Sequence, residues 1–135
     1  IDTDRIAAAH GHLCAGAEVL LAEGAGGFLV PLDAGRSFAD LPALLGMEVL
    51  LVVGLRLGCL NHALLTAEAI AARGLAFSGW IGNGIVPDFA RREAHIETLT
   101  ARLPAPCLGI VPWMAKPSVG EAAAALSGAQ RLRAC

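Results

Sequence analysis

Short apolar runs that alternate with helical patterns constrain the fold of this chain more than any other feature. Four runs have the length and residue types of buried strands, and each is bounded by glycine, asparagine or proline: residues 18–24, 48–54, 76–83 and 107–113. Strands that are apolar on both faces are typical of a parallel sheet covered by helices, with right-handed crossovers. The sequence therefore predicts an α/β fold with a parallel sheet and helices on both faces.

Helices are predicted between and around these runs. Their patterns lie in four stretches: residues 1–13, 60–74, 88–103 and 122–135. Asp2 or Asp4 can cap the first helix, and Gly74 provides a stop for the second. Before the last helix, Ser118 can cap free backbone N–H groups while Glu121 reaches back toward the cap. We therefore expect strand and helix to alternate along the chain.

The length and the first residues of the chain indicate one domain that is incomplete on its amino-terminal side. A chain of 135 residues fits a single domain, and no linker, repeat or charge block divides it. It starts with Ile1 rather than methionine and enters directly on a helical pattern. Because 56% of the residues are hydrophobic and 16% are charged, we expect an oligomer interface to cover surplus apolar surface. The prediction is one α/β domain over residues 1–135.

Charge and cysteine usage exclude several classes of protein. The formal net charge is −2 and the ten basic residues are spread along the chain, which does not fit a nucleic-acid footprint. The four cysteines show no C-x-x-C spacing, which favours a reducing cytoplasm. The longest apolar run, around residues 48–55, is under half the ~20 residues that span a bilayer. We therefore expect a cytoplasmic protein with neither nucleic-acid nor membrane partners.

Ligands of parallel sheets bind at the carboxyl ends of the strands, which directs attention to four short segments. They are residues 23–27, 57–61, 83–84 and 112–114. Glu23 stands out because an unpaired carboxylate buried at the end of an apolar strand is costly. It can cap a turn or pair with Arg36 or Arg56. It can instead hold Mg²⁺, which takes one or two protein carboxylates and otherwise keeps waters and phosphate oxygens.

The turn after this carboxylate is rich in glycine. Gly24, Gly26 and Gly27 allow the backbone to approach a ligand closely or to turn with a positive φ. The sequence GAGGFL begins like the dinucleotide fingerprint GxGxxG, but Leu29 stands at the closing position and no acidic ribose partner follows at the right distance. We therefore expect neither NAD nor FAD to bind here.

The second segment leads into a predicted helix. Gly58 and Cys59 come directly before it, with Asn61 in its first turn. Free N–H groups and the helix dipole can bind an anion at such a helix start, whereas ordinary capping by Asn61 is the alternative. A catalytic role for Cys59 would need a histidine and an orienting group nearby in space, which a sequence does not show.

The third segment holds an amide, and an aromatic residue lies in or near each of the last two segments. Asn83, which lies between two glycines, can read the edge of a purine or can simply occupy a turn. Trp80 and Trp113 lie at or near strand ends, and we expect both in the core.

Taken together, four motifs in order along residues 18–114 resemble dethiobiotin synthetase. They are EGAGG at the end of the first strand, GLRLGCLNHALLT between the second strand and its helix, GWIGNG ending the third strand and LGIVPW ending the fourth. Each motif is weak alone, whereas four in register at strand ends are specific. The resemblance implies a P-loop NTPase-like fold and a homodimeric ligase of biotin biosynthesis. Such enzymes close the ureido ring of dethiobiotin from 7,8-diaminononanoate and CO2 through a carbamate that ATP phosphorylates with Mg²⁺.

The resemblance also implies roles for particular residues. Glu23 matches a ligand of Mg²⁺. The residues that match the ATP site are Glu23, Gly24, Ala25, Gly26, Asn83, Gly84, Pro112, Trp113 and Met114. Within this set, Asn83 with Gly84 reads adenine, and the segment 112–114 lines the base pocket. The residues that match the site for the substrate carboxylate, reached from the neighbouring subunit, are Gly58, Cys59, Leu60 and Asn61.

The chain departs from this family in two ways. Ser118 follows Pro117 where the family can carry an acidic nucleotide contact, so no such role is assigned. The chain also has no phosphate loop of the form GxxxxGK[ST], no lysine for the transferring phosphoryl group and no second carboxylate for magnesium. In the family these lie upstream of the position matching Ile1. No catalytic residue is therefore assigned in this segment, and we expect the 135 residues alone to be inactive.

Two other functions stay open at this point. A related ATP-dependent amide-forming enzyme of cobalamin synthesis can share the EGAGG turn. A non-catalytic α/β dimerisation or nucleotide-binding module could descend from the same fold. A phosphate loop upstream in the intact gene would exclude the module, whereas a true start codon at Ile1 would favour it.

Overall fold

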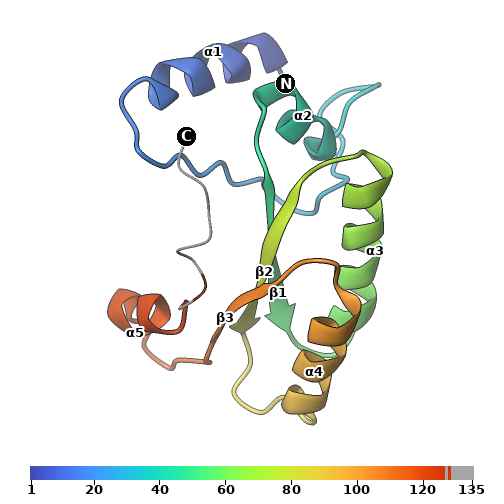
Figure 1. Ribbon diagram of the computed structural model, residues 1–135, viewed down its shortest axis with the longest axis vertical. Helices are drawn as coiled ribbons and strands as arrows, with labels where there is room; N and C mark the ends of the chain where they lie inside the picture. The colour runs from blue at the N-terminus through green and yellow to red at the C-terminus, as the bar shows by residue number, and fades with distance from the viewer. Residues whose placement is uncertain (127, 129–135) are drawn as a thin grey trace. The chain divides into compact units, whose positions relative to one another are not determined.

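A computed structural model describes residues 1–126 and residue 128 of the chain (Figure 1). Contacts divide the described residues into two compact units, Ile1–Glu48 and the part that begins at Val49. The sheet lies entirely in the second unit, and the first unit contains only helices, turns and one isolated bridge among the described residues. A single domain over residues 1–135 stays a prediction.

The second unit is built on a three-stranded parallel sheet. Its strands, in the spatial order β1-β2-β3, are β1 (Val49–Leu55), β2 (Phe77–Gly84) and β3 (Cys107–Val111). These strands confirm three of the four predicted runs, with β3 ending two residues before the predicted end. Valine, leucine and isoleucine dominate β1 and β3, but β1 is not buried on both faces, since Val53 and Leu55 are buried whereas Val52 is 56% exposed.

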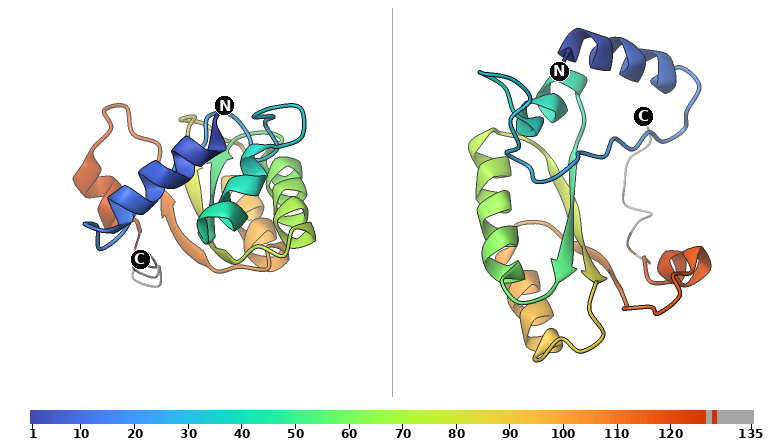
Figure 2. Two further views of the ribbon diagram at one scale, coloured as in Figure 1. Left: turned by 90° about the horizontal axis from the view of Figure 1, so that it is seen from above. Right: turned by 180° about the vertical axis from the view of Figure 1, so that it is seen from behind.

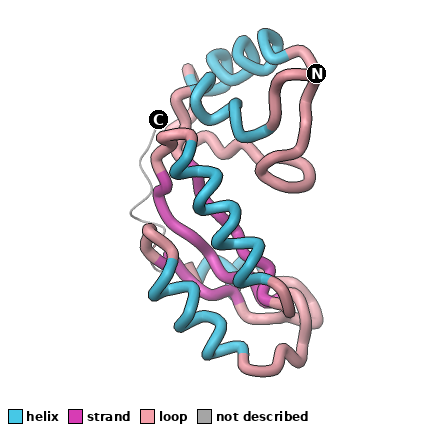
Figure 3. The backbone as a smooth tube through the Cα atoms, turned by 90° about the vertical axis from the view of Figure 1, so that its right-hand side faces the viewer, coloured by secondary structure: helices cyan, strands magenta, loops and turns pink. Residues whose placement is uncertain are grey.

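Helices flank this sheet. The crossover from β1 to β2 is α3 (Cys59–Ala72), and the crossover from β2 to β3 is α4 (Arg92–Arg102). Both helices lie over the same face of the sheet, while α5 (Val119–Ala124) lies on the opposite side (Figures 2 and 3). The arrangement confirms the predicted α/β class.

The core lies between the sheet and the pair α3 and α4. Trp80 of β2 and Leu99 of α4 are fully buried, and Leu55 of β1 is 1% exposed. On α3, Ala63 and Ala67 turn their small side chains to this core, as the apolar stripe of the sequence predicts. Burial of Trp80 confirms one of the two core predictions for tryptophan.

Two predictions about this unit are wrong. Trp113 is 41% exposed, because the chain leaves the sheet at Val111 and carries the ring outward. The helix predicted from residue 88 begins at Arg92, since Arg91 has a φ of 58° in the left-handed region and cannot continue an α-helix toward the amino terminus.

The start of α5 follows the predicted cap. The Ser118 hydroxyl oxygen accepts a hydrogen bond from the backbone N–H of Glu121 at 3.4 Å. The helix ends at Ala124, so it is shorter than predicted, and residues 127 and 129–135 of the predicted stretch lie outside the described residues. In the described part of the chain, no helix has the length and apolar character needed to cross a membrane.

The first unit begins with a capped helix. In α1 (Thr3–Cys14) the Asp2 carboxylate accepts the backbone N–H groups of Asp4 and Arg5 at 3.0 and 3.2 Å, which confirms Asp2 as the cap. A turn between Pro31 and Ser37 follows, closed by an antiparallel bridge. Two short elements complete the unit: the 3-10 helix η1 (Phe38–Asp40) and α2 (Leu41–Leu45).

The strand predicted over residues 18–24 is absent. This segment has no helix or strand assignment, and Val19 and Leu21 are 54% and 75% exposed. A strand exists only where a neighbouring chain segment takes its N–H and C=O groups, and no segment of the first unit lies alongside as a partner among the described residues. The residue types are those of a buried strand, but no described residue of this unit pairs with it.

Candidate functional site

A cavity of about 360 Å³ lies on the side of the sheet that faces α5. Its walls come from all three strands, from the segment that leads into α5 and from α5 itself: Val52, Ile81, Asn83, Val111, Met114, Pro117, Ser118, Val119 and Ala122. Asn83 and Ser118 are the two polar residues of this wall. The cavity is thus an apolar pocket with one amide at the carboxyl end of β2, where α/β sheets bind ligands.

Asn83 is held in place by its backbone. It pairs with Gly54 of β1 and Val111 of β3, so the strands on either side fix its position. Its half-buried side chain has no hydrogen-bond partner among the described residues. An amide offers two donors and an acceptor, and all three are available to a ligand in the cavity.

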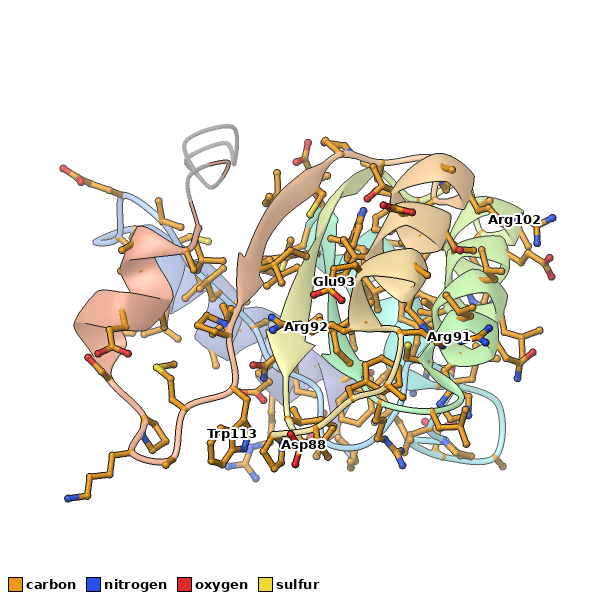
Figure 4. All side chains as sticks on the ribbon, turned by 90° about the horizontal axis from the view of Figure 1, so that it is seen from below. Asp88, Arg91, Arg92, Glu93, Arg102 and Trp113 are labelled. Carbon is orange, nitrogen blue, oxygen red and sulfur yellow. The ribbon has the colours of Figure 1, made fainter. Side chains whose placement is uncertain are left out.

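The end of β2 meets the segment that follows β3 directly beside the cavity. A Cβ atom added to Gly84 would lie 2.5 Å from the backbone nitrogen of Trp113 and 3.0 Å from the carbonyl carbon of Pro112. Only glycine therefore permits this approach. Met114 lines the cavity, whereas Pro112 and Trp113 contact Gly84 and do not line it. Figure 4 shows the Trp113 ring at the end of the sheet, on the same side as Asp88.

These contacts bring together the residues expected in a base pocket. Asn83 and Gly84 lie next to the segment 112–114, as expected from the resemblance. Val52, Ile81 and Val111 form the apolar wall, and no site role was predicted for them from the sequence. Ile81 stands two residues before Asn83, and alternation along a strand places such residues on one face of the sheet. The two-residue alternation along β2 was therefore the sequence signal that could have identified Ile81 as a wall residue of the cavity.

The start of α3 carries unpaired backbone donors. Gly58 is the residue before the helix, with φ 91°, and no side chain caps it. In the described part of the chain, no acceptor is present for the backbone N–H groups of Leu60 and Asn61. Capping by Asn61 is therefore wrong, and the helix start retains two N–H groups that can bind an anion. Cys59 is only 3% exposed and packs in the core, which argues against a role as nucleophile.

Glu23 lies in the first unit and is exposed. It forms no hydrogen bond or ion pair with the described residues. The predicted pairing with Arg36 is wrong, because the guanidinium of Arg36 binds the Asp33 carboxylate at 3.1 Å and the hydroxyl of Thr3 instead. A free carboxylate fits Mg²⁺ bound through one protein ligand, water and phosphate. No group of three or more His, Cys, Asp or Glu residues that could hold a metal by themselves occurs in the described residues.

The turn after Glu23 is compact. Gly26 adopts a φ of 90°, as its sequence context predicts, and a Cβ atom there would lie 2.9 Å from the Val30 side chain. Gly24 packs against the ring of Phe38. Ala25 and Gly26 are exposed with Glu23, so the backbone of residues 23–26 is accessible to a ligand.

Comparison with known proteins gives consistent matches. The profile of the AAA domain family matches residues 1–119. The chain is 52% identical over 126 residues to the ATP-dependent dethiobiotin synthetase BioD of Aromatoleum aromaticum, which covers 93% of this chain and 56% of that protein. It is 54% identical over 109 residues to the protein of the same name from Pseudomonas paraeruginosa, covering 81% of this chain and 47% of the relative. The chain spans about half the length of these curated relatives.

These matches agree with the motifs and the fold. The resemblance to dethiobiotin synthetases is confirmed, because relatives at about half identity carry that name over most of the chain. The parallel sheet with its flanking helices agrees with the expected P-loop NTPase-like class. This chain belongs to the AAA domain family, because the profile of that family matches far more than half of the chain's residues.

Proposed function

We propose that the chain is part of an ATP-dependent dethiobiotin synthetase and that the cavity beside Asn83 binds the adenine base of ATP. One observation carries this proposal: an unpaired amide stands at the carboxyl end of β2 in a mostly apolar pocket, whose other polar lining residue is Ser118. The names of the curated relatives support the assignment. Because the chain spans about half the length of these relatives, we assign the phosphate loop and its lysine to a part of the enzyme that this chain does not span.

The amide of Asn83 suits adenine chemically. Its carbonyl oxygen accepts from the exocyclic amino group, while its NH₂ donates to a ring nitrogen beside that group. The apolar walls from Val52, Ile81 and Met114 would contact the faces of the base. Gly84 allows the end of β2 to approach the segment after β3, whose Met114 lines the cavity, so it acts as a positioning residue for the pocket.

The second subsite binds a carboxylate. The backbone N–H groups of Leu60 and Asn61 stand at the positive end of α3, and both lack partners in the described part of the chain. We assign the carboxylate to 7,8-diaminononanoate bound mainly by the partner subunit of a homodimer. Gly58 and Cys59 complete the turn, since the former has the left-handed φ and the latter anchors the helix in the core.

Glu23 is the proposed protein ligand of Mg²⁺, and Gly24 to Gly26 lie along the phosphates and the reacting diamine. When bound, the ion would neutralise charge on the transferring phosphoryl group. The reaction proposed for the whole enzyme forms a carbamate from one amine and CO2. ATP then phosphorylates the carbamate to release ADP, and the second amine attacks its carbonyl carbon, closing the ring and expelling phosphate. This chain's residues hold the base, the carboxylate and the cation rather than the phosphoryl group. The cytoplasm is the proposed location.

A nucleotide titration followed by tryptophan fluorescence tests the base pocket. Trp113 is partly exposed beside the cavity and Trp80 is fully buried, so ATP should change the emission of Trp113. We expect Asn83→Ala to weaken ATP binding about tenfold, because it removes both hydrogen bonds to the base. Trp113→Phe should remove the signal while binding persists by calorimetry. Equal affinity of wild type and Asn83→Ala for ATP would contradict the adenine assignment.

A second experiment separates the enzyme from a non-catalytic module and from an amide-forming enzyme of cobalamin synthesis. The chain is combined with the phosphate-loop portion of a curated relative, and ATP, Mg²⁺, bicarbonate and 7,8-diaminononanoate are supplied. Formation of dethiobiotin supports the proposal. Binding of ATP without ring closure, in a complex that has formed, would favour the module.

A further inference from the structure

We propose that Cys14 is a reactive thiol that exchanges with low-molecular-weight disulfides, and that His10 activates it. Both residues lie on α1 in the first unit (Figure 1). The Cys14 sulfur lies 3.5 Å from Nε2 of His10 and 3.9 Å from Nδ1, so the thiol is within hydrogen-bonding distance of a base. The inference concerns thiol chemistry alone and would stand whether or not the cavity beside Asn83 binds ATP.

The geometry of α1 holds this pair together. Side chains four residues apart are neighbours on the surface of a helix, so His10 and Cys14 share one face. Both side chains are partly exposed, so a small molecule in solution can reach the sulfur. The helix α2, which packs against α1, consists of leucine, proline and alanine and brings no titratable side chain to the pair.

The three cysteines in the described part of the chain have different surroundings. Cys59 is 3% exposed and packs in the core, out of reach of a reagent. Cys107 is partly exposed, but its thiol donates to the carbonyl oxygen of Gly109 at 3.7 Å, which favours the protonated form. Of these three, only Cys14 lies within hydrogen-bonding distance of an imidazole. Because the thiolate is the nucleophile, we expect Cys14 to react first.

The exchange conserves atoms and electrons. His10 takes the thiol proton, and the Cys14 thiolate attacks one sulfur of the small disulfide. A new S–S bond forms to Cys14, the S–S bond of the reagent breaks, and the leaving thiolate takes the proton from the imidazolium. While thiolate and imidazolium coexist, the dipole at the end of α1 acts on the two charges in opposite directions, favouring the imidazolium and opposing the thiolate. A small thiol reverses the reaction by the same steps.

Reaction with glutathione disulfide tests the site. The full chain is used with Cys135→Ser, because Cys135 lies outside the described residues. We expect one glutathionyl group per chain, located at Cys14 by peptide mass mapping. An ordinary thiol is only a few per cent thiolate at pH 7, so Cys14 should react at least about fivefold faster than Cys107 at that pH.

Two histidine variants of this parent protein separate activation from a structural role. His10→Gln keeps a side chain that can hydrogen-bond to the sulfur but is not a base, and it should slow modification about fivefold. His12→Gln, exposed and two residues away, is the matched control and should leave the rate unchanged. The pH profile gives a readout that packing does not change. The modification rate of the parent protein should reach its plateau at a lower pH than the rate of His10→Gln.

The contrary outcomes are distinct. Equal rates and equal pH profiles for the parent protein and His10→Gln would overturn the activation by His10. Modification of Cys107 as fast as Cys14, or a Cys14 that does not react, would overturn the site itself. Circular dichroism checks that each variant keeps its helices, and the comparison of Cys14 with Cys107 in the parent protein needs no change within α1.

Discussion

The two units contain the same kinds of apolar runs, but only one of them forms a sheet. In the second unit, Leu55 of β1 is 1% exposed because β2 lies beside it and α3 packs above it. In the first unit, residues 18–24 have an equally apolar sequence, yet Leu21 is 75% exposed and no strand forms among the described residues. Strand-like residues are therefore insufficient, since a strand also needs a neighbour for its backbone.

The largest difference in stability between the two units is expected for a matched pair of leucine substitutions. Leu55→Ala should lower the free energy of unfolding by about 2–5 kcal/mol, because it leaves a cavity in a packed core. Leu21→Ala should change it by less than about 0.5 kcal/mol, since that side chain is already in water. Urea denaturation followed by circular dichroism measures both. An equal loss of unfolding free energy in the two variants would show that residues 18–24 are packed in solution.

A smaller effect is expected where the end of β2 meets the loop after β3. Gly84→Ala should cost about 1–3 kcal/mol, because its Cβ would overlap the backbone of Trp113. It should also weaken ATP binding in the fluorescence titration by opening the pocket. Gly120→Ala is the control: the nearest atom would be 3.9 Å away and the position is helical, so stability should hold or rise. A Gly84→Ala variant with unchanged stability and ATP affinity would refute the proposed role of this contact.

The exposed carboxylate of the first unit is predicted to matter for ligand binding and not for folding. Glu23→Gln should leave the free energy of unfolding within about 0.5 kcal/mol, because Glu23 has no partner in the described residues. Mg²⁺ should increase ATP affinity about tenfold less in this variant than in the wild type. Calorimetry with and without Mg²⁺ measures this gain. Glu18→Gln, exposed and nearby in sequence, should keep it, and equal behaviour of the two variants would remove Glu23 from the metal site.

The smallest predicted effect concerns pH and the turn at Asp33. The backbone N–H of Gly35, followed by the N–H and guanidinium of Arg36, holds the pKa of the Asp33 carboxyl below its ordinary value of 3.8. A lowered pKa means that the turn is stabilised above pH 3.8 and loses this support as the pH falls through and below that value. NMR titration should show the Gly35 amide signal shifting with a midpoint below 3.8. A midpoint above 3.8 would contradict these hydrogen bonds, and Asp33→Asn should abolish the titration.

Sequence reasoning succeeded where the determinants were local. Asp2 and Ser118 cap their helices as predicted, and the strands around Trp80 follow from runs with strong apolar character. The failures depended on the surroundings of each residue. No pattern shows that residues 18–24 lack a pairing partner, and none shows that Arg91 takes a left-handed φ. The residues of the proposed base pocket could be predicted from the motif resemblance. The close contact that Gly84 makes with the segment after β3 is visible only in the three-dimensional structure.

The most direct measurement is a crystal structure of the chain with Mg²⁺ and a non-hydrolysable ATP analogue. The account predicts the adenine ring in the cavity between Val52 and Met114, with the Asn83 amide hydrogen-bonded to its edge. A base bound elsewhere, or a cavity that stays closed to nucleotide at millimolar concentration, would contradict the central claim.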